Sequence, residues 1–181
     1  MTWVAGQVPD REGQTIVDLG AGTGNLTGKL PVSASVIAVD TSARMFKIAR
    51  QKLKGRQVTY IEDDILAFLT GRLEPCDAIV STYALHHLTS EEKAMALRAM
   101  AGQLRPGGSI VIGDLMFQNA AARGAALEHY RSSGQSDLAQ DIEDEFFWDL
   151  EVDQQTLRDA GFALETRQFS DLSRGLCARR P

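Results

Sequence analysis

Three glycines stand in alternate positions directly after a short apolar run. They are Gly20, Gly22 and Gly24, in the stretch IVDLGAGTGNL. Glycine lets the backbone approach a ligand or a neighbouring element closely, because it has no side chain. Asn25 stands where the dinucleotide fingerprint Gly-x-Gly-x-x-Gly has its third glycine. Lys29 does not fit the lysine of a P-loop. The spacing therefore weakens both phosphate-binding interpretations.

Carboxylates accompany this glycine loop. Asp40 ends the second apolar run, where an acid can accept hydrogen bonds from both ribose hydroxyls or cap the next helix. Asp63 and Asp64 end the third run, and adjacent side chains point to opposite sides. We expect one of them to face a cleft and accept from an adenine amino group, and the other to start a turn. Asp18 lies inside an apolar run, so it needs a partner, either a cationic ligand group or the N–H groups of the loop.

Two adjacent histidines, His86 and His87, follow the fourth apolar run. Histidine titrates near neutral pH and therefore suits a general base, although one of the two can equally pack against or cap the following helix. Tyr83 and Asp114 are weaker candidates for contacts with a substrate. The spacing of His86, His87 and Asp114 matches no metal-binding motif, so we expect no metal site.

Alternating strand and helix patterns must position these residues. Buried strands are expected at 15–20, 35–40, 58–64, 76–84 and 109–116. Helices are expected at 42–53 and at 90–104, the latter with a capping box of Thr89 and Glu92, and another begins at Asn25. This alternation predicts βαβ units and a parallel sheet covered on both faces. Such sheets bind ligands beyond the carboxyl ends of their strands, where the glycine loop lies.

The end of the chain departs from this rhythm. We expect a helix capped by Asp153 and ended by Gly161. The strands 162–170 and 175–180 follow so closely on one another that they must pair antiparallel. The whole chain, 1–181, is expected to form one domain, in which 1–14 is a short N-terminal segment.

Residues 117–151 are expected to form a helical insertion and a substrate region. One helix is expected around 118–132 and a second toward Phe146–Trp148, whose aromatic rings suit either a pocket or the core. The second half is acidic and contains no lysine or arginine. That run is either a solvated helix face or a field that favours cationic substrates. His129 is expected on a helix surface.

The composition narrows the classes of function. The chain has 181 residues, a formal net charge of −5 and 44% hydrophobic residues. An acidic chain is a poor match for nucleic acid or for an anionic membrane surface. No signal peptide and no membrane-spanning stretch is visible, and two distant cysteines suit the reducing cytoplasm. We expect a cytoplasmic protein without nucleic-acid or membrane partners.

Five motifs occur in order: VDLGAGTG, VIAVDTSARM, IEDDILAF, CDAIVSTYALHHL and LRPGGSIVIGD. They resemble the ordered motifs of class I S-adenosylmethionine-dependent methyltransferases, and LRDAGF extends the resemblance toward the C-terminus. GTGNLT, STYALHHLTSEEK and FQNAAA are most similar to small bacterial YrrT-type methyltransferases. The resemblance implies a Rossmann-like, doubly wound, mostly parallel seven-stranded sheet with an antiparallel C-terminal strand and helices on both faces.

The resemblance also implies S-adenosyl-L-methionine as cofactor and a role for each matching residue. Asp40 would bind the ribose hydroxyls, Asp64 would contact the adenine amino group, and Tyr83 would face the methyl group together with the end of the fourth strand. The cofactor-binding residues that it implies are Asp18, Gly20, Ala21, Gly22, Gly24, Asn25, Asp40, Thr41, Met45, Asp63, Asp64, Ile65, Ser81 and Thr82. The catalytic candidates are His86, His87 and Tyr83.

The sequence therefore predicts a methyltransferase that moves a methyl group to a small-molecule acceptor by in-line displacement and forms S-adenosylhomocysteine. Such a displacement needs accurate positioning more than it needs a base. Members of the family usually carry a longer N-terminal helical segment that closes over the cofactor, whereas fourteen residues precede the first strand here. The alternative is a module that binds either form of the cofactor without turnover. A nucleotide-dependent oxidoreductase is disfavoured by Asn25.

Overall fold

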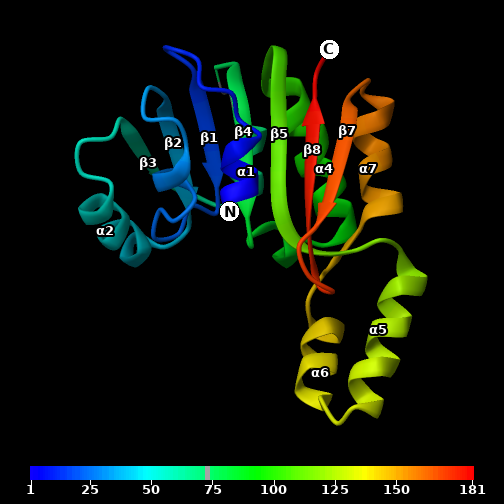
Figure 1. The fold of residues 1–181 in the computed structure, drawn as a ribbon. Coiled ribbons are helices and arrows are strands. Elements are labelled where there is room, and N and C mark those ends of the chain that lie inside the picture. Colours follow the sequence, from blue (N-terminus) through cyan, green and yellow to red (C-terminus); the bar gives the residue numbers. More distant parts are fainter. Residues whose placement is uncertain (72–73) are drawn as a thin grey trace.

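The computed structural model describes residues 1–71 and 74–181 and contains a mixed sheet in the order β3-β2-β1-β4-β5-β8-β7, with β6 paired to β5 (Figure 1). The strands are β1 (Thr15–Leu19), β2 (Ser35–Asp40), β3 (Val58–Glu62), β4 (Cys76–Thr82), β5 (Leu104–Phe117), β6 (Trp148–Asp149), β7 (Ala163–Gln168) and β8 (Ser173–Arg179). The strands β1 to β5 pair parallel with one another. The Rossmann-like, doubly wound, mostly parallel sheet predicted from the sequence is confirmed.

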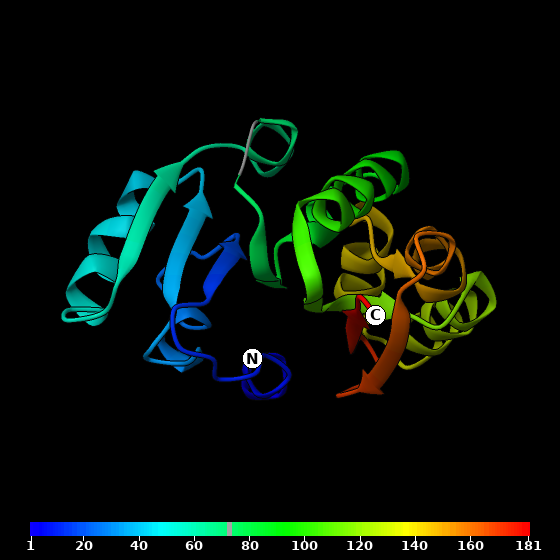
Figure 2. The ribbon, with the colours of Figure 1, turned by 90° about the horizontal axis from the view of Figure 1, so that it is seen from above.

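Helices cover both faces of this sheet (Figure 2). They are α1 (Thr2–Gly6), α2 (Ala43–Lys52), α3 (Ile65–Thr70), α4 (Ser90–Gln103), α5 (Ala120–Ser132), α6 (Ser136–Asp144) and α7 (Leu150–Asp159), with 3-10 turns η1 (Thr27–Lys29) and η2 (Leu85–His87). Successive strand residues point to opposite faces, so Val17 belongs to the core cluster that includes residues of α3, α4 and α7, whereas Ile16 belongs to the cluster that includes residues of α1. Continuous apolar strands are the consequence of burial on both sides.

The helix expected directly after the glycine loop is absent from the described residues. Turns follow Gly24 instead, and the only regular element between Gly24 and β2 is the short 3-10 turn η1. A single 3-10 turn does not build the aligned row of free N–H groups that a helix N-terminus offers to an anion. The expectation of a helix that begins at Asn25 was therefore wrong.

The C-terminal strands β7 and β8 pair antiparallel, and β8 pairs antiparallel with β5, as expected. The preceding helix, α7, begins earlier than the sequence suggested. Asp149 is its N-cap and accepts hydrogen bonds from the backbone of Glu151 and Val152. Asp153 lies one turn inside the helix and accepts from the backbone N–H of Asp149 at 2.9 Å. The assignment of Asp153 as the N-cap was therefore wrong.

The insertion between β5 and α7 contains α5 and α6, which pack against each other. Figure 1 shows this pair projecting beyond the end of the sheet at which β5 ends. The helix α6 stops at Asp144, before the aromatic cluster, so Trp148 lies in β6 and is fully buried while Phe146 is half-exposed. His129 is exposed on α5, as expected. Within the described part of the chain, no helix combines the length and apolarity needed to cross a membrane.

Candidate functional site

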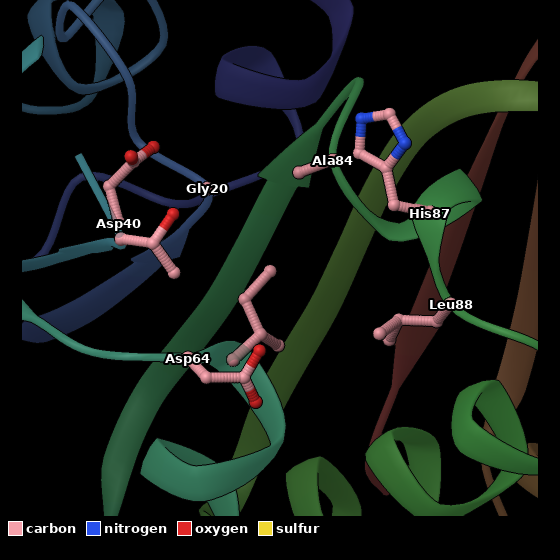
Figure 3. Close-up of a pocket in the computed structure, with 8 residues that line it drawn as sticks. Gly20, Asp40, Asp64, Ala84, His87 and Leu88 are labelled. Atoms are coloured by element: carbon pink, nitrogen blue, oxygen red, sulfur yellow. The ribbon is translucent and has the colours of Figure 1, made fainter.

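One cavity of about 220 Å³ lies at the edge of the sheet where β1, β2, β3 and β4 end. Figure 3 shows Gly20 and Asp40 on one side of it, and His87 and Leu88 on the other. The residues that line it are Gly20, Asp40, Thr41, Asp64, Ile65, Ala84, His87 and Leu88. Motif residues from distant parts of the sequence therefore meet at the edge of the sheet where open α/β folds bind ligands.

The three glycines of the loop meet different neighbours. All have positive φ angles, 68° at Gly20, 53° at Gly22 and 75° at Gly24. A Cβ atom on Gly20 would lie 2.2 Å from the Cβ of Ala84, and one on Gly24 would lie 2.7 Å from the side chain of Leu53 in the turn after α2. At Gly22 no atom would lie closer than 4.0 Å. Gly20 and Gly24 therefore allow close packing, whereas a Cβ at Gly22 would meet Asp40 Oδ2 and the carbonyl oxygen of Gly20 only at ordinary van der Waals distance.

Asp40 holds the loop from the end of β2. Its Oδ2 accepts the N–H of Gly22 at 2.8 Å, and its Oδ1 accepts the N–H of Ser42 at 2.9 Å. The carboxylate still lines the cavity and is only partly buried, so lone pairs are left for a ligand. The following helix is capped by the Ser42 side chain, which accepts from Met45, and not by Asp40. The capping alternative for Asp40 is therefore wrong.

Asp18 is buried beneath the loop, with 1% of its surface exposed. Its partner is Thr27, in the turns after the loop: the hydroxyl donates to Oδ2 at 2.5 Å, and the backbone of Thr27 contributes a further hydrogen bond. Its Oδ1 accepts no hydrogen bond from residues 1–71 or 74–181. Burial raises the pKa of Asp18 to about 7; the hydrogen bond from Thr27 lowers the pKa, and the charge of Asp40 raises it slightly. Because burial disfavours the charged form, the carboxyl of Asp18 favours either binding a proton or pairing with a cation.

Asp63 and Asp64 divide their roles as expected for adjacent side chains. Asp64 lines the cavity and caps α3, because its Oδ1 accepts the backbone N–H groups of Leu66 and Ala67. Asp63 does not line the cavity, and its Oδ1 accepts the N–H of Asp64 at 2.8 Å. Asp64 is therefore the one that is available to a ligand.

The end of β4 carries backbone strain. Tyr83 has a φ angle of 51°, a value that is uncommon for any residue with a bulky side chain. Its N–H donates to the carbonyl oxygen of Gly113 at 3.0 Å, and its side chain is half-exposed. Ser81 and Thr82 are buried, and the Ser81 hydroxyl donates to the carbonyl oxygen of Leu19. Ser81 thus ties β4 to β1, Thr82 pairs with Gly113 of β5, and neither of the two lines the cavity.

The two histidines occupy different environments. His86 is buried, and its Nδ1 lies 2.6 Å from Oδ1 of Asp114, which is itself fully buried. The same carboxylate accepts the N–H groups of Leu85, His86 and Leu115, and the indole N–H of Trp148 at 3.4 Å. The oxygens of the Asp114 carboxylate thus accept hydrogen bonds from several neighbouring groups, and they are not free for a substrate.

His87 lines the cavity and is exposed. Its Nδ1 lies 3.2 Å from Oε2 of Glu145, which follows α6 in the insertion. His86, His87 and Glu145 each offer one metal-ligating atom, and these atoms lie within 4.8 Å of one another. Sequence reasoning missed Glu145, because no spacing rule connects residues 87 and 145. Only the acidic run around it was a signal.

Some predicted cofactor residues lie outside the cavity. Asn25 and Lys29 line a separate cleft with three other basic side chains. Met45 is exposed on α2 and does not line the cavity. Ala21 is buried, and its N–H donates to the carbonyl oxygen of Val39, which fixes the loop to β2. These residues support the loop or flank it, whereas Asp40 and Asp64 face the cavity directly.

A family model described as a methyltransferase domain matches residues 16–108. An uncharacterized methyltransferase of Geobacillus kaustophilus is 44% identical over 146 residues, which cover 80% of this chain and 67% of that protein. The uncharacterized methyltransferase YrrT of Bacillus subtilis is 36% identical over 162 residues, covering 89% of this chain and 75% of that protein.

Among solved structures, the N-methyltransferase NodS of Bradyrhizobium japonicum, in complex with S-adenosyl-l-homocysteine, superposes with a TM-score of 0.72 at 20% identity. The match covers 99% of this chain and 85% of that one, and at this identity it shows a shared fold. The family model and the curated relatives show the family as well as the fold. The chain belongs to the class I S-adenosylmethionine-dependent methyltransferase family.

Proposed function

We propose that this protein transfers a methyl group from S-adenosyl-L-methionine to a small-molecule acceptor and forms S-adenosylhomocysteine. One observation carries the proposal: Asp40 and Asp64 line a single cavity together with Gly20 of the glycine loop. Carboxylates at these strand ends suit the hydroxyls and the amino group of an adenosine, and no α-helix lies between the glycine loop and β2 in the described residues to hold a pyrophosphate at that loop.

The cofactor fits the residues of this cavity. Asp40 would accept hydrogen bonds from the ribose hydroxyls, and Asp64 would accept from the adenine amino group, with Ile65 against the ring. The loop at Gly22, where no side chain intervenes, would lie against the methionine part, whose ammonium would be attracted by the buried carboxyl of Asp18 beneath the loop. The other predicted residues near the glycines and at the end of β4, among them Ala21 and Ser81, would hold the glycine loop in place and would not touch the cofactor.

Catalysis would depend mainly on positioning. The cofactor supplies a methyl group on a positively charged sulfur, which is a good leaving group. The chain has to hold the acceptor in line with that methyl group, and such positioning contributes about 7–11 kcal/mol in favourable systems. Of the predicted catalytic residues, His87 lines the cavity, whereas the strained Tyr83 does not line it and directly precedes Ala84, which does. His86 is engaged with Asp114 and would act only as support.

The acceptor region would be the insertion of α5 and α6 within a single domain. A cavity of about 570 Å³ opens beside α6, between Leu115 of β5 and Phe147, and Glu145 also lines it. Its size suits a small molecule. The net charge of −5 is a poor match for nucleic acid, and the two buried, unpaired cysteines suit a reducing cytoplasm.

Calorimetry tests the cofactor assignment. We expect S-adenosylmethionine and S-adenosylhomocysteine to bind and NAD not to bind. Transfer of a labelled methyl group to a panel of small amines, thiols and phenols then tests turnover. Binding of both cofactor forms without transfer to any acceptor would favour the non-catalytic module, and absence of cofactor binding would refute the proposal.

A further inference from the structure

We propose that Glu145, which lies on the insertion, is a positioning residue that makes His87 a general base, so that the acceptor is a nucleophile carrying a removable proton. This inference rests on the proposed function, because it concerns the same cavity. It adds a residue from a distant part of the chain, and it narrows the acceptor to a protonated amine, a thiol or a hydroxyl compound.

The first step is the contrast between the two histidines. His86 is 9% exposed in its side chain, and its Nδ1 is held by Asp114. His87 is 64% exposed in its side chain and lines the cavity opposite Asp40 (Figure 3). A general base must reach the proton that it removes, so His87 is the one of the two that can meet an acceptor.

The second step is the proton on His87. A carboxylate only accepts hydrogen bonds, so the 3.2 Å contact with Oε2 of Glu145 requires the proton of a neutral His87 to sit on Nδ1. Nε2 is then left with a free lone pair. An acid that orients a histidine in this way is the recurrent arrangement around a histidine base.

The third step is the anchoring of Glu145. The next residue, Phe146, donates its N–H to the carbonyl oxygen of His86 at 3.1 Å. The ammonium of Lys93, itself 1% exposed, donates to the carbonyl oxygens of Phe146 and Leu88. These contacts clamp the segment after α6 against the turn that carries both histidines. Glu145 is therefore held beside His87 by buried hydrogen bonds and not by the exposed pair alone.

The chemical step balances without any further reactant. Nε2 of His87 takes the proton from the acceptor atom, and the lone pair of that atom forms a bond to the methyl carbon. The carbon–sulfur bond breaks, and its electron pair stays on sulfur, which loses its positive charge. The imidazolium that results lies next to the Glu145 carboxylate, which favours its positive charge. An acceptor without a proton on the attacking atom would gain nothing from this pair.

Nuclear magnetic resonance of labelled histidine side chains tests the arrangement without any acceptor, since the chain has only three histidines. We expect neutral His87 to carry its proton on Nδ1 in the wild type and to lose that preference in Glu145→Ala. His129, exposed on α5, is the internal reference, and unchanged His86 signals report an intact fold. Glu128→Ala, which removes an exposed carboxylate from the same insertion, is the matched control and should leave His87 unchanged.

Two results would overturn the inference. One is a wild-type His87 with the same proton distribution as His129. The other is a response of the His86 and His87 signals to a chelator, which would reassign these residues and Glu145 to a metal site. Neither result depends on cofactor binding, so the proposed function would survive both. Conversely, absent cofactor binding would remove the proposed function and leave the histidine geometry measurable.

Turnover provides the second measurement, once the panel has revealed an acceptor. Loss of a positioned base costs about 10²-fold or more, so we expect that loss for His87→Ala. We expect a loss of about tenfold in kcat for Glu145→Ala, with an unchanged KM for the cofactor and partial recovery in Glu145→Gln, whose carbonyl oxygen can still accept from Nδ1. Full activity of Glu145→Ala, or methylation confined to acceptors without a removable proton, would overturn the proposal.

Discussion

The two sides of the cavity are built differently. On the glycine-loop side, two of the acids have partners close in the chain: Asp40 is held by Ser42, and Asp64 by Leu66. Asp40 is also held by Gly22, 18 positions away. On the side of the insertion, the partners are distant. His86 is held by Asp114, and His87 contacts Glu145.

The two sides should also differ in how much their hydrogen bonds contribute to stability. Local turns and caps on the loop side each involve few residues and are exposed or partly exposed. The network around Asp114 is buried and draws together the end of β4, β5 and β6 through Leu85, Leu115 and Trp148. Truncation of a buried charged group leaves its donors unpaired, which costs far more than truncation of an exposed one. We therefore expect stability to depend on the insertion side and ligand binding on the loop side.

The largest effect is expected for Asp114→Ala. The substitution would leave several buried donors unpaired and should lower the free energy of unfolding by about 3–5 kcal/mol. Urea denaturation followed by circular dichroism measures this change. Asp171→Ala, which removes an exposed carboxylate before β8, is the control and should change stability by less than about 0.5 kcal/mol. Similar values for both variants would break the contrast between the two sides.

The buried carboxyl of Asp18 should make stability depend on pH. Its pKa is raised to about 7 in the folded protein, whereas an unfolded aspartate titrates near 4. The folded state therefore binds more protons than the unfolded state between these values, and stability falls as the pH rises from about 4 to about 7. The shift corresponds to at most about 4 kcal/mol.

Urea denaturation at several pH values, compared between the wild type and Asp18→Asn, checks this slope. Asp153, whose pKa burial raises to about 6, contributes a slope of the same sign in both proteins and cancels in the comparison. Equal slopes in the two proteins would show that Asp18 titrates as an ordinary carboxyl.

The two sides of the cavity meet where Gly20 of the glycine loop contacts Ala84, which follows β4. Gly20→Ala would place a Cβ 2.2 Å from that of Ala84 at a positive φ, and we expect a loss of about 2–4 kcal/mol. Gly22→Ala has the same type of backbone but no atom closer than 4.0 Å, so it should lose about 1–2 kcal/mol. Denaturation of both variants separates backbone strain from the clash, and equal losses would mean that the contact with Ala84 relaxes freely.

For Asp40→Ala we expect an effect on ligand binding and little effect on stability. Removal of its carboxylate should weaken the binding of S-adenosylhomocysteine by about 10- to 100-fold, the value of one or two hydrogen bonds to a charged group. Calorimetry measures the change, and the fold should persist. Glu62→Ala is the matched control, because Glu62 pairs in register with Asp40 on β3 and does not line the cavity. Unchanged binding in Asp40→Ala would refute the ribose assignment.

The sequence by itself determined the sheet, the glycine loop and the acids at the strand ends. Apolar runs mark strands that are buried on both faces, and a capping box such as that of Thr89 and Glu92 is a local pattern, confirmed at α4. Prediction from the sequence failed where more than one local pattern suits the same residues. The helix expected at Asn25 is replaced by turns, and α7 is capped by Asp149 and not by Asp153.

Only the tertiary structure decided which histidine faces the cavity and what holds each one. Residues 86 and 87 are neighbours, so no periodicity assigns one to the core and the other to the site. That assignment comes from Asp114 and Glu145, which are brought to the turn by the sheet and by the insertion. The physical reason is that hydrogen bonds between distant residues depend on how the elements pack, and a linear pattern carries no record of that packing.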